Sequence, residues 1–159
     1  VHFSSNNNLS SWSPTHLISA SDGKAEAICL VSDPNGILYA LWLDGTSSDI
    51  KKLYFSRSND SGKTWSARLL LGRDAKYSFI SAKTDGAGNL NIIFSKELSG
   101  AEKVYFLRTI DGGKYWTAQK TISNMDGRSS WQALEIDNAA RLHVVWKGAG
   151  VYYTRSVTY

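Results

Sequence analysis

Ser58-Asn59-Asp60-Ser61-Gly62-Lys63-Thr64-Trp65 recurs further along the chain as Thr109-Ile110-Asp111-Gly112-Gly113-Lys114-Tyr115-Trp116. Both copies place a hydroxyl first, Asp third, Gly fifth, Thr or Tyr seventh and Trp eighth. Each copy lies between two strand-like runs, so it predicts a hairpin turn. Because Gly adopts positive φ without strain and an Asp carboxylate accepts backbone N–H groups within a turn, the pattern predicts a closed hydrogen-bonded loop.

The residues expected to build these two turns are those at the recurring positions of the eight-residue pattern. We expect the first hydroxyl to join the hydrogen bonds of the Asp, and the Trp to pack back between neighbouring sheets. The full set is Ser58, Asp60, Gly62, Thr64, Trp65, Thr109, Asp111, Gly113, Tyr115 and Trp116.

The turn pattern resembles the Asp box, or bacterial neuraminidase repeat, of sialidase-like β-propellers. In that family the box is a folding element on the face away from the catalytic centre. The resemblance therefore implies an architecture and does not imply sialidase activity. It also implies an extracellular or cell-surface location.

Composition narrows the class of protein. The chain has 159 residues, enough for one domain, with 42% apolar and 12% aromatic residues, as in a folded β-rich protein. The 18 Lys and Arg residues give a net charge of +4 but are dispersed, the longest basic run being Lys51-Lys52, which argues against a nucleic-acid partner. No apolar stretch approaches membrane-spanning length, so no membrane partner is expected.

Cysteine and histidine usage argues against metal or redox chemistry. The single cysteine, Cys29, lies in an apolar run and is expected to fill core space as a small hydrophobic residue. His2, His16 and His143 lack the spacing of metal ligands, so no metal or other cofactor is predicted. No secretory leader is visible, and a start at Val1 fits either a processed or excised segment or the removal of an initiator Met.

Strand-like runs recur in four sets, which we name a to d in their order within a repeat. Between the a and b runs stand clusters of Asp, Pro, Asn and Gly, which favour tight turns. No run has a capped helical period, so we predict an all-β chain of four-stranded antiparallel blades. The runs are 25–33, 78–85 and 131–137 (a); 37–42, 90–94 and 142–146 (b); 53–57, 104–108 and 151–155 (c); and 16–19, 68–71 and 119–123 (d).

The order of these runs predicts a single propeller segment over residues 1–159, about three blades long. Residues 25–72 and 78–123 form two whole blades. Residues 1–19 supply strands c and d of a split blade, and residues 130–159 supply strands a, b and c. Between strands c and d of the split blade formed by residues 1–19, residues 5–12 resemble a degenerate box that ends in Trp12.

Three blades do not close a ring, which typically has about 4–8. Two copies of the chain would give the six blades that the sialidase resemblance implies, so a homodimer is one prediction. The alternatives are a segment of a longer propeller, whose other blades are then the partner, and a self-contained small propeller.

The motifs that the resemblance implies for a sialidase are missing. Such an enzyme would carry Arg-Ile-Pro, three arginines for the substrate carboxylate, a Tyr–Glu nucleophile pair and an acid/base Asp. The only prolines are Pro14 and Pro34, so there is no Arg-Ile-Pro and no catalytic residue is assigned. Arg57, Arg108 and Arg155 occupy one repeated place in strand c, which favours a scaffold role or repeated surface charge over a single converging carboxylate clamp.

Candidate ligand-binding residues come from the d–a connections, on the face opposite the boxes. Two of these connections combine a cation with an aromatic residue, a pairing that suits a sugar ring and its hydroxyls. The predicted set is Arg73, Asp74, Tyr77, Asp126, Arg128 and Trp131. The sequence favours a non-catalytic carbohydrate-binding or protein-interaction module. The alternatives are a fragment of a sialidase-like glycoside hydrolase with its catalytic residues elsewhere, or a purely structural assembly propeller.

Overall fold

The computed structural model describes residues 2–3, 12–19, 24–45, 50–123 and 129–157. All regular elements in these ranges are β-strands, and no helix occurs among them. The strands are β1 (His2–Phe3), β2 (His16–Leu17), β3 (Lys24–Ser32), β4 (Leu38–Gly45), β5 (Lys51–Ser58), β6 (Leu69–Thr84), β7 (Leu90–Leu98), β8 (Ala101–Thr109), β9 (Lys120–Thr121), β10 (Ser130–Ile136), β11 (Leu142–Lys147) and β12 (Val151–Arg155).

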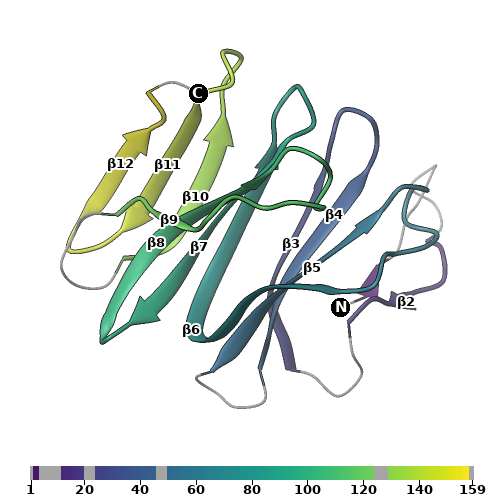
Figure 1. Ribbon diagram of the computed structural model, residues 1–159, viewed down its shortest axis with the longest axis horizontal. Coiled ribbons are helices and arrows are strands. Elements are labelled where there is room, and N and C mark those ends of the chain that lie inside the picture. Colours follow the sequence, from purple (N-terminus) through teal and green to yellow (C-terminus); the bar gives the residue numbers. More distant parts are fainter. Residues whose placement is uncertain (1, 4–11, 20–23, 46–49, 124–128, 158–159) are drawn as a thin grey trace.

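Consecutive strands pair antiparallel and form a series of sheets (Figure 1). We call β3, β4, β5 and the first part of β6 the first blade, and the rest of β6 with β7, β8 and β9 the second. Strands β10, β11 and β12 form the third blade, and β1 pairs with β2. The predicted all-β, partial propeller fold is confirmed.

One predicted connection is absent because β6 runs through it. The sequence suggested a loop over Arg73–Tyr77, between strand d of one blade and strand a of the next. Instead Ala75 pairs with Lys51 of β5, and the adjacent Lys76 pairs with Glu97 of β7. Since pairing passes from one neighbour to the other within two residues, no residue is left to form a loop.

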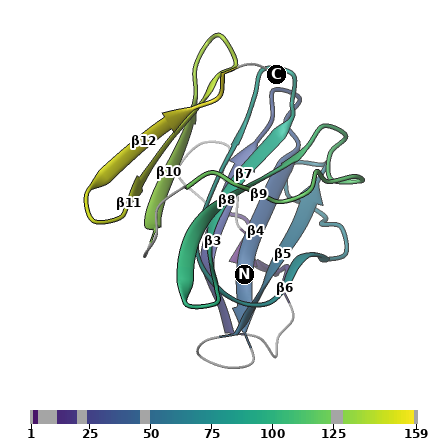
Figure 2. The same cartoon turned by 60° about the vertical axis from the view of Figure 1, so that its left-hand side comes forward.

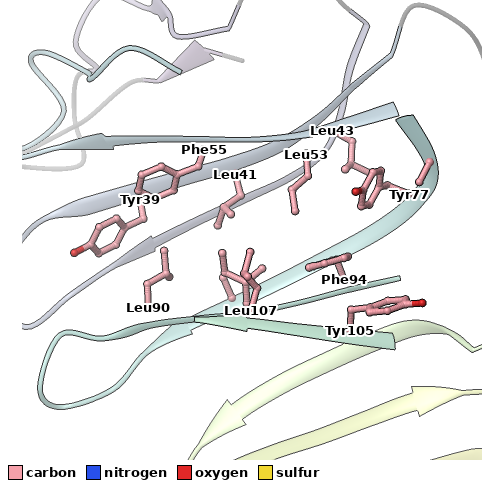
Figure 3. Close-up of a cluster of buried hydrophobic side chains, with 13 residues drawn as sticks. Tyr39, Leu41, Leu43, Leu53, Phe55, Tyr77, Leu90, Phe94, Tyr105 and Leu107 are labelled. Atoms are coloured by element: carbon pink, nitrogen blue, oxygen red, sulfur yellow. The ribbon is translucent and has the colours of Figure 1, made fainter. Parts of the chain in front are cut away.

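The core consists of two apolar layers, one in each gap between blades. The layer between the first and second blades includes Tyr39, Leu41 and Leu53 of the first and Ile92 and Phe94 of the second (Figure 3). Cys29 packs against this layer, and burial raises the pKa of its thiol. The layer between the second and third blades consists of Ile93, Val104, Leu134, Leu142, Val144 and Trp146, with Phe106, Ile122, Ile136 and Tyr152 packed against it. Strand b is therefore covered on both faces in the second blade, which explains its continuous apolar run.

Each blade repeats one aromatic pair across strands b and c. The pairs are Trp42–Tyr54, Phe94–Tyr105 and Trp146–Tyr152, all stacked with ring centroids 5.8 Å apart. Such cross-strand pairs stabilise a sheet by roughly 0.2–1 kcal/mol each. The repeat is thus visible in side-chain packing as well as in strand order.

The turns between strands a and b also repeat their hydrogen bonds. In the first blade Asp33 Oδ1 accepts the backbone N–H groups of Asn35 and Ile37, each at 2.9 Å. The equivalent bonds are present at Asp85 and Asp137. Gly36 and Gly88 have positive φ in the first two turns, and Ala140 takes that place in the third with φ of 57°. The third turn therefore keeps the geometry without the glycine.

The two turns that were quoted first form the predicted hydrogen bonds. Ser58 Oγ donates to Asp60 Oδ1 at 2.8 Å, and Asp60 Oδ1 accepts the backbone N–H of Thr64 at 2.9 Å. In the second copy Thr109 Oγ1 donates to Asp111 Oδ1 at 2.8 Å, and that oxygen accepts N–H groups from Lys114 and Tyr115. Gly62 and Gly113 have φ of 85° and 95°, as expected.

The second of these turns also makes the predicted contact between blades. The indole of Trp116 meets the Phe55 ring of the first blade edge-on, with centroids 5.1 Å apart. Trp116 Nε1 donates to Gly113 O at 3.1 Å, which fixes the indole over its own turn. The turn therefore links two neighbouring sheets.

Candidate ligand-binding site at the strand bulges

Each strand a contains a β-bulge that the sequence did not reveal. The pairing register shifts near the start of β3 and of β10, and in the second part of β6 between Ser78 and Ile80. At the bulges Ala27, Phe79 and Trp131 have φ of 49°, 49° and 53°, a region that residues with a Cβ seldom occupy. Bulges re-aim side chains and often lie next to functional sites.

The bulges lie toward the end of the blades opposite the two quoted turns. In the second blade the bulge follows Ser78, which pairs with Ser95 near the β7–β8 connection. The quoted turn instead follows Thr109, which pairs with Leu90 at the other end of β7. This is the face on which the sequence predicted a ligand.

Trp131 presents an exposed aromatic surface on this face. Its side chain is 67% exposed, and its ring packs on Phe79 of the second blade with centroids 4.8 Å apart and planes at 34°. An exposed indole supported by a second ring is a stacking surface that needs little further ordering.

A hydrogen-bond chain ties the two bulges together. Gln132 Nε2 donates to the backbone oxygen of Phe79 at 2.5 Å, and Ser95 Oγ lies 2.8 Å from Gln132 Oε1. Within the second blade Ser78 Oγ donates to Glu102 Oε1, and Glu102 O accepts the N–H of Ser129, just before the third blade, at 2.8 Å. The residues on both sides of Trp131 are therefore hydrogen-bonded to the second blade, which holds the stacking surface in place.

The predicted ligand residues are placed in different surroundings. Tyr77 is only 3% exposed and packs against Phe94 in the core, so its ring is not available as a platform for a sugar. The reason is that β6 is continuous there, which makes position 77 an inward-facing strand position. Trp131 is exposed on the third blade, and Asp126 and Arg128 lie outside the described residues.

Arg73 and Asp74 belong to β6, and Arg73 is exposed. Arg73 and Tyr77 line a pocket of about 450 Å³ between the first two blades, together with Leu70, Leu71, Gly72, Lys96 and Gln119. The structure thus brings Arg73 close to Tyr77, in a pocket whose lining does not include Trp131. In the same pocket Lys96 Nζ donates to Gln119 Oε1 at 2.7 Å, and burial lowers the pKa of Lys96.

Sequence reasoning missed Phe79 and Gln132 as parts of this region. Aligned repeats place Ala27, Phe79 and Trp131 at one position, and an aromatic residue at two of three copies was a usable signal for Phe79. Nothing comparable pointed to the bulge, since its cause lies in the pairing of β6 and β10 with their neighbours.

In the part of the chain that the structure describes, no three His, Cys, Asp or Glu side chains gather as a metal site would require. No helix among the described residues has the length and apolar character needed to cross a membrane.

Comparisons with known proteins place the fold. No protein-family model matches the chain, and no curated protein sequence does so. Among solved structures, the Hadza microbial sialidase Hz136 superposes with a TM-score of 0.70 at 13% identity, over 92% of this chain and 35% of that one.

Two other solved structures are similar to this chain, with somewhat lower TM-scores and comparable sequence identity. The endo-arabinase from Bacteroides thetaiotaomicron has a TM-score of 0.60 at 14% identity, over 93% of this chain and 61% of that one. A polysaccharide lyase described as an ulvan lyase has a TM-score of 0.59 at 12% identity, over 84% and 41%. The chain thus spans between about a third and three fifths of these structures. Its described strands form about three blades of a sialidase-like β-propeller fold.

Proposed function

We propose that this chain is a non-catalytic carbohydrate-binding module whose ligand stacks on Trp131. The observation that carries the proposal is the indole of Trp131, held on a bulge, supported by Phe79 and exposed to solvent. A sugar ring offers an apolar C–H face for the indole and hydroxyl groups for neighbouring polar side chains.

The chemistry of the similar structures supports a sugar rather than a peptide. Their names describe a sialidase, an endo-arabinase and an ulvan lyase bound to a GlcA–Rha3S oligosaccharide. We propose that the two repeated turns are Asp boxes of the same kind of propeller. Their hydrogen bonds support this reading, because in each turn a hydroxyl donates to the Asp carboxylate and the carboxylate accepts backbone N–H groups.

Binding to a glycan array, followed by calorimetric titration of the best glycan, tests the proposal. We expect Trp131→Ala to weaken binding by roughly tenfold or more, because the stacking surface is removed. Tyr115→Ala is the matched control, since Tyr115 is 81% exposed but belongs to the turn at the opposite end of the second blade. Equal affinity of the Trp131 variant and the unchanged chain would contradict the proposed site.

A second candidate is a segment of a sialidase-like glycoside hydrolase whose catalytic residues lie outside this chain. The similarity to 35% of the sialidase Hz136 favours this alternative. Turnover of a fluorogenic sialoside by this chain alone would replace our proposal with an enzymatic one. A chain that neither binds glycans nor turns over the sialoside is the result expected both for this second candidate and for a purely structural assembly propeller, and it would contradict the binding proposal.

A further inference from the structure

An apolar slot separates the second and third blades near the outer strands. It has a volume of about 400 Å³, and its apolar lining includes Phe106, Ile122, Leu142 and Val144. Thr154 of β12 lines it from the third blade. All these residues belong to the described part of the chain and lie on, or directly after, facing strands of the two blades.

The same place between the first and second blades is filled by an indole. Phe55 stands two positions before Arg57, as Phe106 stands two positions before Arg108, and Trp116 packs on Phe55. Trp116 also lies against the core layer that contains Leu90 and Ile92, the counterparts of Leu142 and Val144. The slot between the second and third blades therefore has the same kind of lining as the space that the Trp116 indole fills between the first and second blades.

Trp12 has the sequence context of such an indole. In three places a Trp stands four positions before the first residue of an outer strand or strand segment: Trp12 before His16, Trp65 before Leu69 and Trp116 before Lys120. Trp116 is packed between blades, whereas Trp12 is 70% exposed. Trp12 thus precedes an outer strand at the same spacing as Trp116, but its indole is not packed between blades as that of Trp116 is.

The edge beside the slot can also accept a strand. Among the described residues, β12 pairs with β11 on one side and with no strand on the other (Figure 2). In the second blade the equivalent edge of β8 carries β9, with Tyr105 opposite Thr121 and Phe106 opposite Lys120. By the same register β2 would place Leu17 opposite Tyr152 and His16 opposite Tyr153.

The strand that could fill this edge lies at the other end of the same copy. Figure 1 places β2 beside the first blade and β12 at the far side of the third blade. Within the described residues β2 is held by only two residue pairs to β1, His2 with Leu17 and Phe3 with His16. A second copy can therefore supply β2 at the cost of a short pairing.

We propose that the slot binds Trp12 of a second copy of this chain, with β2 of that copy added to β12. Reciprocal exchange gives each copy one donated and one accepted indole, which is a two-fold symmetric arrangement. Added strands of this kind bind through backbone hydrogen bonds, and a side-chain pocket supplies specificity. This association is independent of any sugar binding at Trp131.

Sedimentation velocity over a concentration series tests the proposal with the full chain. We expect a dimer of twice the 17.6 kDa chain mass. Trp12→Ala is expected to raise the dimer dissociation constant by about tenfold or more, because it removes the anchor. Tyr115→Ala, which removes an exposed aromatic side chain elsewhere, should leave the dimer unchanged.

A mixing experiment separates the two halves of the contact. Thr154→Trp should fill the slot from within and give a monomer with an intact Trp12. Mixing it with Trp12→Ala, whose slot is intact, should restore a heterodimer held by one exchanged strand. Melting curves of each variant alone establish that both are folded.

Any one of three results would overturn the proposal. The first is an unchanged chain that is monomeric at every concentration. The second is a Trp12→Ala variant that dimerises as tightly as the unchanged chain, and the third is a failure of the two mixed variants to associate although both are folded.

Discussion

At Gly113 the backbone and a neighbouring ring act together. Its φ is 95°, and a Cβ at this position would lie 2.6 Å from a ring carbon of Phe55. Gly36 has a similar φ of 80°, yet a Cβ there would meet nothing within 4 Å. The two glycines therefore separate the cost of backbone strain from the cost of a steric clash between blades.

We predict that Gly113→Ala lowers the free energy of unfolding by about 2–4 kcal/mol, because strain of about 1 kcal/mol adds to overpacking against Phe55. Gly36→Ala should cost only about 1 kcal/mol, since strain acts alone there. Urea unfolding of both variants measures the difference. Equal losses at the two positions would contradict a tight contact at Phe55.

Ala140 provides the converse control. It occupies with φ of 57° the turn position that Gly36 and Gly88 hold in the other blades. Ala140→Gly should therefore leave stability unchanged or raise it by up to about 1 kcal/mol, as left-handed strain is relieved. A clear loss would argue that positive φ is not the source of the cost at Gly36.

At the scale of a single turn, the Asp60 carboxylate organises its loop through charge. Hydrogen bonds from the Thr64 hydroxyl, from the Thr64 backbone N–H and from Ser58 lower the pKa of Asp60 to about 2. An unfolded Asp has a pKa of about 3.9. Because the folded pKa is the lower one, the ionised carboxylate stabilises the fold above about pH 4, and this contribution is lost as the pH falls toward 2.

We predict that Asp60→Asn lowers the melting temperature near neutral pH, since the amide cannot replace both accepting oxygens. As the pH falls from about 4 to about 2, the difference between the unchanged chain and the variant should narrow, because the native Asp60 becomes protonated. Thermal melts across this range measure the difference. A constant difference would show that the charge of Asp60 contributes nothing.

At the scale of the whole molecule, β6 joins the first two blades into one structure. Its first part pairs with β5 and its second part with β7, and the apolar layer between the blades draws on both. The loss of one blade therefore exposes the core of the other. This arrangement favours cooperative unfolding of the two blades.

We predict that far-UV circular dichroism and tryptophan fluorescence report one coincident urea transition for these blades. Phe55→Ala, which thins the layer between them, should shift both signals together to lower urea by an amount that corresponds to about 3–5 kcal/mol. Two separated transitions, with only one displaced by the substitution, would contradict the coupling.

Much of the fold follows from short-range sequence patterns. The turns at Asp60 and Asp111 hydrogen-bond within their own eight residues, so their residue types were sufficient to predict them. Strand order followed from the recurrence of apolar runs, although the junction at Arg73 was predicted as a loop. Closure of the ring and the domain limits remain predictions, because they depend on surfaces of other blades.

The candidate site was less predictable, because it depends on contacts between strands distant in sequence. Tyr77 and Trp131 were predicted to play the same part, yet one is buried in the core and the other exposed. The reason is that Trp131 corresponds to Phe79, on the bulge itself, whereas Tyr77 lies two residues before the bulge and corresponds to the buried Ser129.

The chain's own residue order was thus enough to specify turns, strands and the repeating blade, because these rest on hydrogen bonds and periodicities within a few residues. The exposed indole at Trp131, the buried ring of Tyr77 and the slot beside Val144 emerged only from the packing of blade against blade. Their physical cause is long-range: each depends on which neighbouring strand covers a side chain, and no local pattern encodes that choice.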